Sequence, residues 1–373
     1  MDSIRVFLRL KPCDDERQCV EVTGPSSVRF LTRSAEEPQR FTFDAVGGPE
    51  CRQEDVWEAV GRELTDECLR GYNATIFAYG QTGSGKTYTM QGDVDSHDFG
   101  MIPRCFEYLY AELAKRSGEW KTSIRCTFVE IYNETVYDLL AADDADMETA
   151  RTVREQRNGA VYVEGAREEA LGSASDALRV FLRGSQNRHV AETRMNRESS
   201  RSHSIFTLFL HSTRHGAVEE TRQSRFNLVD LAGSERQQAT GTVGVRLKEA
   251  GNINRSLLAL SNVISALSET GLSAKHVHYR DSKLTFLLRE SLGGNARTVI
   301  IACVSPALAC HGETLSTLRF AQRAKLIQNR PVVNQEMHGS VADLQAEIRR
   351  LQDLLDAVPQ ATVNGAVQQQ EQV

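Results

Sequence analysis

The 373-residue chain lacks the sequence features of membrane and secreted proteins. No apolar run approaches the roughly 18 residues that a membrane-spanning helix requires. The first residues enter an alternating strand pattern at once, without the basic segment, apolar stretch and small-residue cleavage site of a secretion signal. We therefore expect a cytoplasmic protein with no membrane partner.

Disulfide and zinc-binding patterns are also absent. The eight cysteines are scattered from Cys13 to Cys310, and none forms a CxxC pair or stands at zinc spacing with histidines. We expect reduced and mostly buried thiols. The formal net charge of -6 argues against nucleic acid as a partner, because nucleic-acid-binding domains are usually basic. An acidic partner would have to be bound by a local basic patch.

The composition is typical of a folded protein, with 40% hydrophobic and 25% charged residues. Runs rich in Ile, Val, Phe and Thr predict strands, and longer stretches of helical period separate them. This alternation predicts an α/β fold, with a central, mostly parallel twisted sheet, helices on both faces and ligand sites at the carboxyl ends of strands. The strands are predicted at Ile4–Leu10, Ala74–Gly80, Arg125–Asn133, Ser204–Thr213, Arg225–Leu231 and Thr298–Val304, and helices at Glu54–Leu69 and Asp176–Arg183.

The second predicted strand leads directly into a phosphate-binding pattern. Residues 80–87 read GQTGSGKT and match the P-loop pattern GxxxxGK followed by Ser or Thr in full. The glycines let successive backbone N–H groups turn toward phosphates, Lys86 can reach the terminal phosphates, and Thr87 can ligate magnesium. A complete match after a predicted strand favours a nucleotide site over a glycine-rich turn without function.

Two further segments have the composition of a phosphate-sensing site. Asp230 ends a predicted strand and precedes Gly233, the order expected for a magnesium-side acid and a glycine that contacts a γ-phosphate. Residues 196–203 read NRESSRSH and concentrate hydroxyls, a guanidinium and an imidazole in one loop. Each segment is ambiguous alone, since the DxxG pattern is common and the loop also fits a polar surface turn.

Together, in this order and spacing, the three segments resemble the kinesin superfamily, with its phosphate loop, switch I (NxxSSRSH) and switch II (DLAGSE). The resemblance covers roughly residues 4–335 and includes YRDSKLT at 279–285 and SLGGN at 291–295. Four segments are most similar in sequence to the kinesin-12 subfamily of mitotic spindle motors: NRESSRSH, EAGNINRSL, FLLRESLGGNA and GETLSTLRFAQRAKLIQN. The resemblance implies a P-loop NTPase of kinesin type that hydrolyses ATP to ADP with Mg²⁺ and moves on microtubules.

The resemblance also implies roles for residues at the nucleotide. Lys86 and Thr87 would hold the phosphates and magnesium, Asp230 would hold a magnesium-bound water, and Gly233 would sense the γ-phosphate. Lys11 stands where the family has the second arginine of its adenine-binding segment. The implied nucleotide-binding residues are Arg9, Pro12, Gln81, Thr82, Gly83, Ser84, Gly85, Lys86, Thr87 and Tyr88, and the implied metal ligands are Thr87, Ser200 and Asp230.

Further catalytic roles are implied for the two switch segments. Ser199 and Ser200 would position magnesium and the attacking water, with Asn196 in support. Arg201 and Glu235 would form an ion pair that closes the switches over the nucleotide. Phosphoryl transfer depends mainly on positioning and charge stabilisation, so this set of residues suits it without a strong general base.

A helix predicted from Lys248 to Ser268 has an apolar stripe on one side and polar residues on the other. The polar face alone is typical of solvated surface. Because tubulin is acidic, the resemblance instead makes this helix and its flanking loops the microtubule-binding face. The basic residues implied for that face are Arg246, Lys248, Arg255, Lys275, Arg280 and Lys283.

The predicted organisation has four parts. Residues 1–325 form the motor domain, and 326–339 form a neck linker whose position after the core is typical of plus-end-directed motors. Residues 340–358 begin a neck helix with heptad-like spacing, followed by a disordered tail at 359–373. With fewer than three heptads, a coiled coil that joins two chains and a single capping helix both fit.

Three other functions share parts of this sequence pattern. A small GTPase would need an N/T-K-x-D segment, which the chain lacks, and a nucleic-acid translocase is disfavoured by the acidic balance. A microtubule binder of kinesin fold that no longer cycles ATP is the closest rival. The complete set of phosphate-loop and switch residues favours an active ATPase over that rival.

Overall fold

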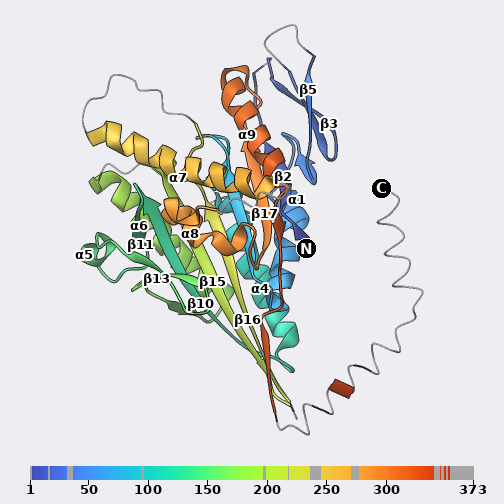
Figure 1. Cartoon of the computed structure of the whole chain (residues 1–373), viewed down its shortest axis with the longest axis vertical. Helices are drawn as coiled ribbons and strands as arrows, with labels where there is room; N and C mark the ends of the chain where they lie inside the picture. The colour runs from blue at the N-terminus through green and yellow to red at the C-terminus, as the bar shows by residue number, and fades with distance from the viewer. Residues whose placement is uncertain are drawn as a thin grey trace.

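A twisted, mixed β-sheet runs through the centre of the computed structural model (Figure 1). Its strand order is β11-β10-β15-β16-β7-β17-β2-β6. The strands span β2 Arg5–Leu10, β6 Ala45–Gly47, β7 Ala74–Tyr79, β10 Lys121–Tyr132, β11 Thr135–Asp138, β15 Ser202–Arg214, β16 Glu219–Asp230 and β17 Arg297–Val304. The structure describes residues 2–15, 17–31, 37–93, 96–195, 199–216, 218–235, 245–269 and 277–339, and residues 345, 348, 349 and 352.

The expectation of a mostly parallel sheet holds for one half of it. Strands β16, β7, β17, β2 and β6 pair in parallel, whereas β11, β10, β15 and β16 pair antiparallel. The antiparallel half arises because β15 and β16 are 13 and 12 residues long and follow one another as a hairpin. The six strands predicted from the sequence all form, and the long ones extend beyond their predicted ends.

Helices cover both faces of the sheet, as expected (Figure 1). Helices α7, α8 and α9 pack on one face, and α2, α4 and α6 pack on the other. The helical segments are α1 Gln53–Val56, η1 Trp57–Gly61, α2 Arg62–Leu69, α3 Lys86–Met90, α4 Met101–Arg116, α5 Asp144–Met147, α6 Ala174–Met195, η2 Ser199–Arg201, α7 Val245–Ser268, η3 Tyr279–Asp281, α8 Lys283–Leu287, η4 Arg289–Ser291, η5 Leu308–Cys310 and α9 His311–Ala324.

Strand β7 contributes side chains to the hydrophobic cores on both faces of the sheet. All six of its residues are buried, and alternate side chains point to opposite faces. Phe77 and Tyr79 join the core under α7 and α9, while Ile76 and Ala78 join the core under α2 and α4. This continuous apolar strand carries the phosphate-binding segment at its carboxyl end.

Short strands complete the fold around the sheet. The segment after α9 contributes two of them: β18 pairs with β1, and β19 pairs with the start of β16. No helix in the described part of the chain is long and apolar enough to cross a membrane. The short strands are β1 Asp2–Ser3, β3 Val20–Gly24, β4 Ser27–Phe30, β5 Gln39–Thr42, β8 Gly92–Asp93, β9 Asp98–Phe99, β12 Thr152–Glu155, β13 Val161–Glu164, β14 Glu169–Leu171, β18 Gln328–Asn329 and β19 Gln335–His338.

The aromatic cluster under α4 and α6 should dominate the stability of that face. Phe206 is fully buried, and its ring centroid lies 5.5, 5.3 and 5.5 Å from those of Phe106, Phe128 and Phe181. Phe206→Ala should lower the free energy of unfolding by about 3–5 kcal/mol through lost burial and a residual cavity. Urea unfolding measures this, with Leu258→Ala as a control at a 60% exposed position. Equal losses in both variants would contradict the assignment of this core.

Candidate functional site

The phosphate-binding segment lies where the sequence predicts it, between the end of β7 and the start of α3. Gly83 and Gly85 adopt positive φ values of 74° and 97°, which glycine tolerates without a steric penalty. Lys86 is buried, and its Nζ donates a hydrogen bond to the carbonyl oxygen of Gln81 at 2.9 Å. Burial lowers the pKa of Lys86, and the nearby carboxylate of Asp230 partly opposes this shift. The loop therefore holds a cation in a largely dry site.

Asp230, at the end of β16, connects this loop to the neighbouring strand. The Thr87 hydroxyl donates to Asp230 Oδ2 at 2.8 Å, and Asp230 Oδ1 is buried without a hydrogen-bond partner among the described residues. These oxygens are the hard donors that Mg²⁺ prefers. No cluster of three or more His, Cys, Asp or Glu suited to a metal occurs in the described part of the chain. The residues present thus fit a magnesium ion held by one carboxylate, hydroxyls and nucleotide phosphates.

The two predicted switch segments meet directly above the loop. The Gly233 amide donates to the carbonyl oxygen of Ser200 at 2.8 Å, and the Ser234 amide donates to that of Gly80 at 3.0 Å. Glu235 accepts hydrogen bonds from the amide and the hydroxyl of Thr82 at 2.8 and 2.5 Å. In the described part of the chain, the recorded partner of the Glu235 carboxylate is Thr82 of the phosphate loop, and the implied pairing of Glu235 with Arg201 stays a prediction.

Arg188 of α6 lies beneath the site, although no sequence motif points to it. Its side chain is buried, and its Nη1 lies 3.4 Å from Asp230 Oδ2 and 3.2 Å from Ser204 Oγ. Arg188 Nε lies 3.6 Å from a carboxylate oxygen of the fully buried Glu130. The guanidinium balances two carboxylates beneath the site. Nothing in the local pattern of α6 sets Arg188 apart, because its recorded partners lie on β10, β15 and β16.

The contacts of Arg9 differ from the adenine contact that the sequence predicts for it. Arg9 is buried, and its Nη1 donates to Gln53 Oε1 at 2.8 Å and to Thr89 Oγ1 at 2.9 Å. Its guanidinium carbon lies 5.2 Å from the ring centroid of Tyr88, whose hydroxyl donates to Asp98. Arg9 therefore supports Tyr88 and does not line the cleft.

The cleft itself has a volume of about 560 Å³. Gln81 and Ser84 do not line it, because their side chains bond elsewhere: Gln81 Nε2 donates to Cys310 Sγ at 3.0 Å, and Ser84 Oγ donates to the Gln81 carbonyl oxygen at 2.8 Å. Asn196 and the Ser199 side chain lie outside the described residues. The lining residues are Lys11, Pro12, Thr82, Gly83, Gly85, Lys86, Thr87, Tyr88, Ser200, Asp230 and Leu231.

The predicted basic surface is only partly defined. Arg255 on α7 and Lys283 at the start of α8 are exposed. Arg280 is paired with Glu155 of β12 at 2.7 Å, so its charge is partly neutralised within the chain. Arg246 and Lys248 lie in α7 with side chains outside the described set, and Lys275 lies outside the described residues altogether.

Lys283 is positioned by Glu134, a residue that no sequence motif singles out. Glu134, in the turn between β10 and β11, accepts hydrogen bonds from the Ser282 hydroxyl at 2.7 Å and from the Lys283 amide at 2.8 Å. Glu134 has a positive φ of 61°, a conformation that residues other than glycine adopt uncommonly. This turn fixes the start of α8 and thereby the backbone of Lys283.

His203 connects the cleft to α7. The Ala232 amide donates to His203 Nδ1 at 2.9 Å, so the neutral ring carries its proton on Nε2, which lies 2.8 Å from Ser256 Oγ of α7. Burial, with Arg188 and Lys86 nearby, lowers the pKa of His203 to about 3. The residue therefore acts as a neutral structural hydrogen-bonder.

Residues 9–327 match the kinesin motor domain. The chain belongs to the kinesin family. It is 48% identical over 373 residues to rat kinesin-like protein KIF15, covering 95% of this chain and 26% of the rat protein. It is 45% identical over 369 residues to Arabidopsis thaliana kinesin-like protein KIN-12C, covering 94% and 18%. These relatives confirm the kinesin-12 resemblance, and the chain spans about a quarter of their length or less.

Solved kinesins confirm the fold of this motor domain. The structure of a fast kinesin matches with a TM-score of 0.82 at 40% identity, covering 90% of this chain and 94% of that chain. A KIF14 dimer in a two-heads-bound state, with AMP-PNP and in complex with a microtubule, matches with a TM-score of 0.79 at 38% identity. That match covers 89% of this chain and 96% of that chain. Kinesin motors bind ATP and ADP, which suits the position of the cleft.

The buried His203 predicts a pH dependence for the stability of this kinesin motor domain. Below pH 6.5 the unfolded chain gains a proton on His203 that the folded chain accepts only near a pKa of about 3. The free energy of unfolding should therefore fall as pH falls below 6.5, by up to about 1.4 kcal/mol per pH unit from this residue.

Urea unfolding between pH 7 and pH 5 measures this contribution. The free energy of unfolding should depend less steeply on pH in His203→Asn than in the unsubstituted chain. The difference in slope should correspond to one bound proton. His338→Asn is the control, because the His338 side chain is 62% exposed. The same slope in the chain with His203 and in His203→Asn would count against a neutral, buried imidazole.

Proposed function

We propose that this chain is a microtubule-stimulated motor ATPase that binds ATP or ADP with Mg²⁺. The observation that carries the proposal is the hydrogen bond between the Gly233 amide and the Ser200 carbonyl oxygen, 2.8 Å long, which joins both switch segments over the phosphate loop. Such a junction can report the presence of a γ-phosphate because it lies within reach of the loop that holds one.

The residues of the cleft divide the work of phosphoryl transfer. Lys86 supplies fixed positive charge for the terminal phosphates, and Thr87 and Asp230 supply oxygens for Mg²⁺, with Ser200 at the same cleft. Bound Mg²⁺ would neutralise developing negative charge on the phosphate oxygens. Ser199, with Asn196 in support, would position the attacking water. Positioning and electrostatics then provide most of the catalysis.

The switch contacts provide a mechanism for sensing the nucleotide. Gly233 can donate its amide to Ser200 or to a γ-phosphate, but not fully to both. Glu235 has a similar choice between Thr82, its partner here, and Arg201, the partner implied by family resemblance. Exchange of these partners would convert phosphate binding into movement of the segment that leads to α7.

The track is proposed to be the microtubule. Exposed Arg255 and Lys283 lie on α7 and α8, and both can face an acidic partner. Arg246, Lys248 and Lys275 remain proposed contributors, while Arg280 contributes less because of Glu155. The related KIF14 dimer was solved on a microtubule. A cytoskeletal location, on the spindle in dividing cells, follows from this proposal.

Residues 326–339 are proposed as a neck linker in its docked position. The Ile4 amide donates to the Ile327 carbonyl oxygen at 3.0 Å, and β18 and β19 continue the docking along β1 and β16. Asn334 donates from its side chain to the Gly71 carbonyl oxygen at 3.0 Å. A docked linker after the core supports plus-end-directed movement.

The division into domains follows the same proposal. Residues 1–325 would form the motor, 340–358 a neck helix that can pair two chains, and 359–373 a disordered tail. Nearly all of 340–373 lies outside the described residues.

Steady-state ATPase with and without stabilised microtubules tests the proposed function. We expect stimulation, and Arg255→Ala with Lys283→Ala should raise the microtubule concentration for half-maximal rate by about 5- to 10-fold, since each exposed charge contributes up to about 1 kcal/mol. Basal turnover should stay within about two-fold. Arg29→Ala is the control, on the small sheet of β3, β4 and β5.

Two outcomes would contradict these expectations. An unchanged half-maximal concentration in the double variant would exclude this surface as the microtubule site. Microtubule co-sedimentation without turnover would favour the rival function, a kinesin-fold binder that does not cycle ATP.

The linker proposal predicts a separate defect in force transmission. Asn334→Ala removes hydrogen bonds to Gly71 and to Asn295 Nδ2, each contributing about 1 kcal/mol to docking. Microtubule gliding should slow several-fold while basal ATPase stays within two-fold of the unsubstituted protein. Val332→Ala, at a 60% exposed linker position, is the matched control. Equal gliding velocities for the two variants would contradict a latching role for Asn334.

A further inference from the structure

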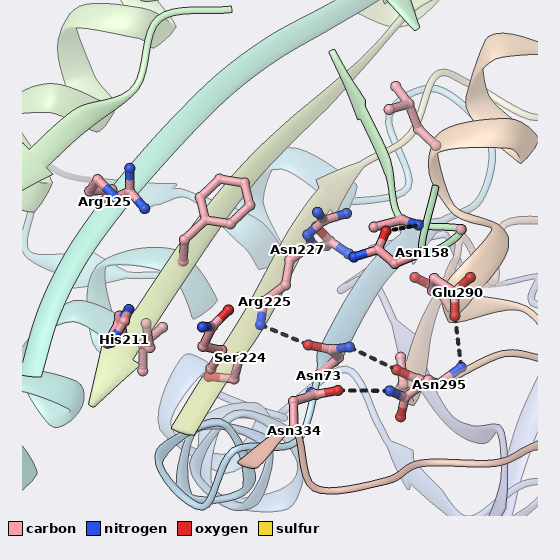
Figure 2. A pocket seen from close by; sticks show the side chains of 18 residues that line it. Asn73, Arg125, Asn158, His211, Ser224, Arg225, Asn227, Glu290, Asn295 and Asn334 are labelled. Atoms are coloured by element: carbon pink, nitrogen blue, oxygen red, sulfur yellow. Dashed lines mark hydrogen bonds between the residues drawn. The ribbon is translucent and has the colours of Figure 1, made fainter. Parts of the chain in front are cut away.

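A second cavity has a volume of about 370 Å³. Figure 2 shows the side chains that line it. It is bounded by residues 209–211 of β15, residues 223–227 of β16, the turn at 158–160 and the segment 287–296. None of the described residues that line it lines the nucleotide cleft as well. A ligand of this cavity would therefore bind at a place separate from the ATP site.

One wall of this cavity is an amide network that is already satisfied. Asn73 Nδ2 donates to the Asn295 carbonyl oxygen at 3.0 Å, and Asn295 Nδ2 donates to Asn334 Oδ1 at 2.9 Å (Figure 2). Asn227 bonds Thr207 and Thr75 through its two side-chain atoms. These groups form a rigid polar wall and leave few free donors or acceptors for a ligand.

Arg225 is the lining residue that keeps positive charge available for a ligand. Its Nη1 donates to the Val161 carbonyl oxygen at 2.8 Å, and its guanidinium carbon lies 5.3 Å from the ring centroid of Phe209. Among the described residues, no carboxylate lies within ion-pair distance of it. Burial lowers the pKa of Arg225, with Glu290 and Glu168 opposing the shift. A partly desolvated guanidinium without an ion-pair partner favours binding of an anion.

The surrounding groups define where an anion fits. The Asn158 Oδ1 accepts the Ala160 amide at 3.0 Å, which leaves the Asn158 side-chain amide as a donor near the Arg225 guanidinium (Figure 2). Arg125 adds positive charge, though its Nη1 is already 2.8 Å from Glu168. Glu290 is the carboxylate of this cavity, and its Oε2 accepts the Asn295 amide at 3.1 Å. An anionic group is therefore favoured beside Arg225 and Asn158 and disfavoured beside Glu290.

We propose that this cavity binds a small molecule through a carboxylate or phosphate group held by Arg225 and Asn158. The remainder of the ligand extends toward Glu290 and Asn295, where a neutral or hydrogen-bond-donating group fits best. Because Asn334 is part of the same wall, an occupied cavity stabilises the docked position of residues 331–334. The binding step stands independently of the proposed motor activity.

Ligand-observed ¹⁹F NMR tests the site with 4-(trifluoromethyl)benzoate as the probe, on the whole chain with Mg²⁺ and ADP present to occupy the phosphate loop. We expect saturable binding that Arg225→Gln weakens by about ten-fold and Arg225→Lys weakens less. Glu290→Gln, which keeps an oxygen for the Asn295 amide, should tighten binding. Arg154→Gln, at an exposed arginine outside the cavity, should leave it unchanged.

Competition with phenyl phosphate then separates the two anion types. Displacement of the probe at lower concentration than benzoate requires identifies a phosphate site, and the reverse order identifies a carboxylate site. Absence of saturable binding overturns the proposal. So does equal binding by the Arg225→Gln and Glu290→Gln variants, and the second variant remains informative if the first fails to fold.

Hydrogen exchange tests whether an occupied cavity stabilises the docked position of residues 331–334. The Val332 amide donates to Asn295 Oδ1 at 2.7 Å, and the Asn334 amide donates to the Gly71 carbonyl oxygen at 2.9 Å. Saturation with the probe should slow exchange at both amides several-fold. Binding with unchanged exchange would overturn the stabilisation of residues 331–334.

Discussion

The carboxylate of Asp230 is the contact on which the rest of the site depends. It ends β16, accepts the Thr87 hydroxyl from the phosphate loop and lies 3.4 Å from the Arg188 guanidinium of α6. Three elements from distant parts of the sequence thus meet at one carboxylate, and both contacts are made to Asp230 Oδ2. Because these groups are buried, each interaction is stronger than it would be in water, and the loss of one leaves a charge without a partner.

Strand β16 extends this arrangement across the molecule. Its carboxyl end holds Asp230, and its first residues pair with β19, so Arg222 lies opposite Gln335. The nucleotide cleft and the segment after α9 therefore share one continuous element. His203 makes a second connection, from the residues after β16 to Ser256 of α7. The first connection is a continuous strand, and the second is a pair of hydrogen bonds through one imidazole ring.

The sequence revealed those features that depend on neighbours along the chain. The phosphate loop was predictable because its glycines, Lys86 and Thr87 are contiguous, and the strands were predictable because each is a buried apolar run. The roles of Arg188 and Glu134 were not predictable because their partners are distant in sequence. The family motif predicts Arg9 at the adenine, but its buried guanidinium bonds Gln53 and Thr89. The pairing of Arg280 with Glu155 likewise depends on tertiary packing.

The alternation of side chains along the central strands has a consequence for how this motor domain melts. Adjacent residues of β15, Ile205 and Phe206, belong to cores on opposite faces of one sheet. Neither core can lose its strands without exposing the other, so the two faces are expected to unfold in a single cooperative transition. Any ligand that binds only the folded chain then raises the melting temperature of both layers together, and thermal shift reports on occupancy at either cavity.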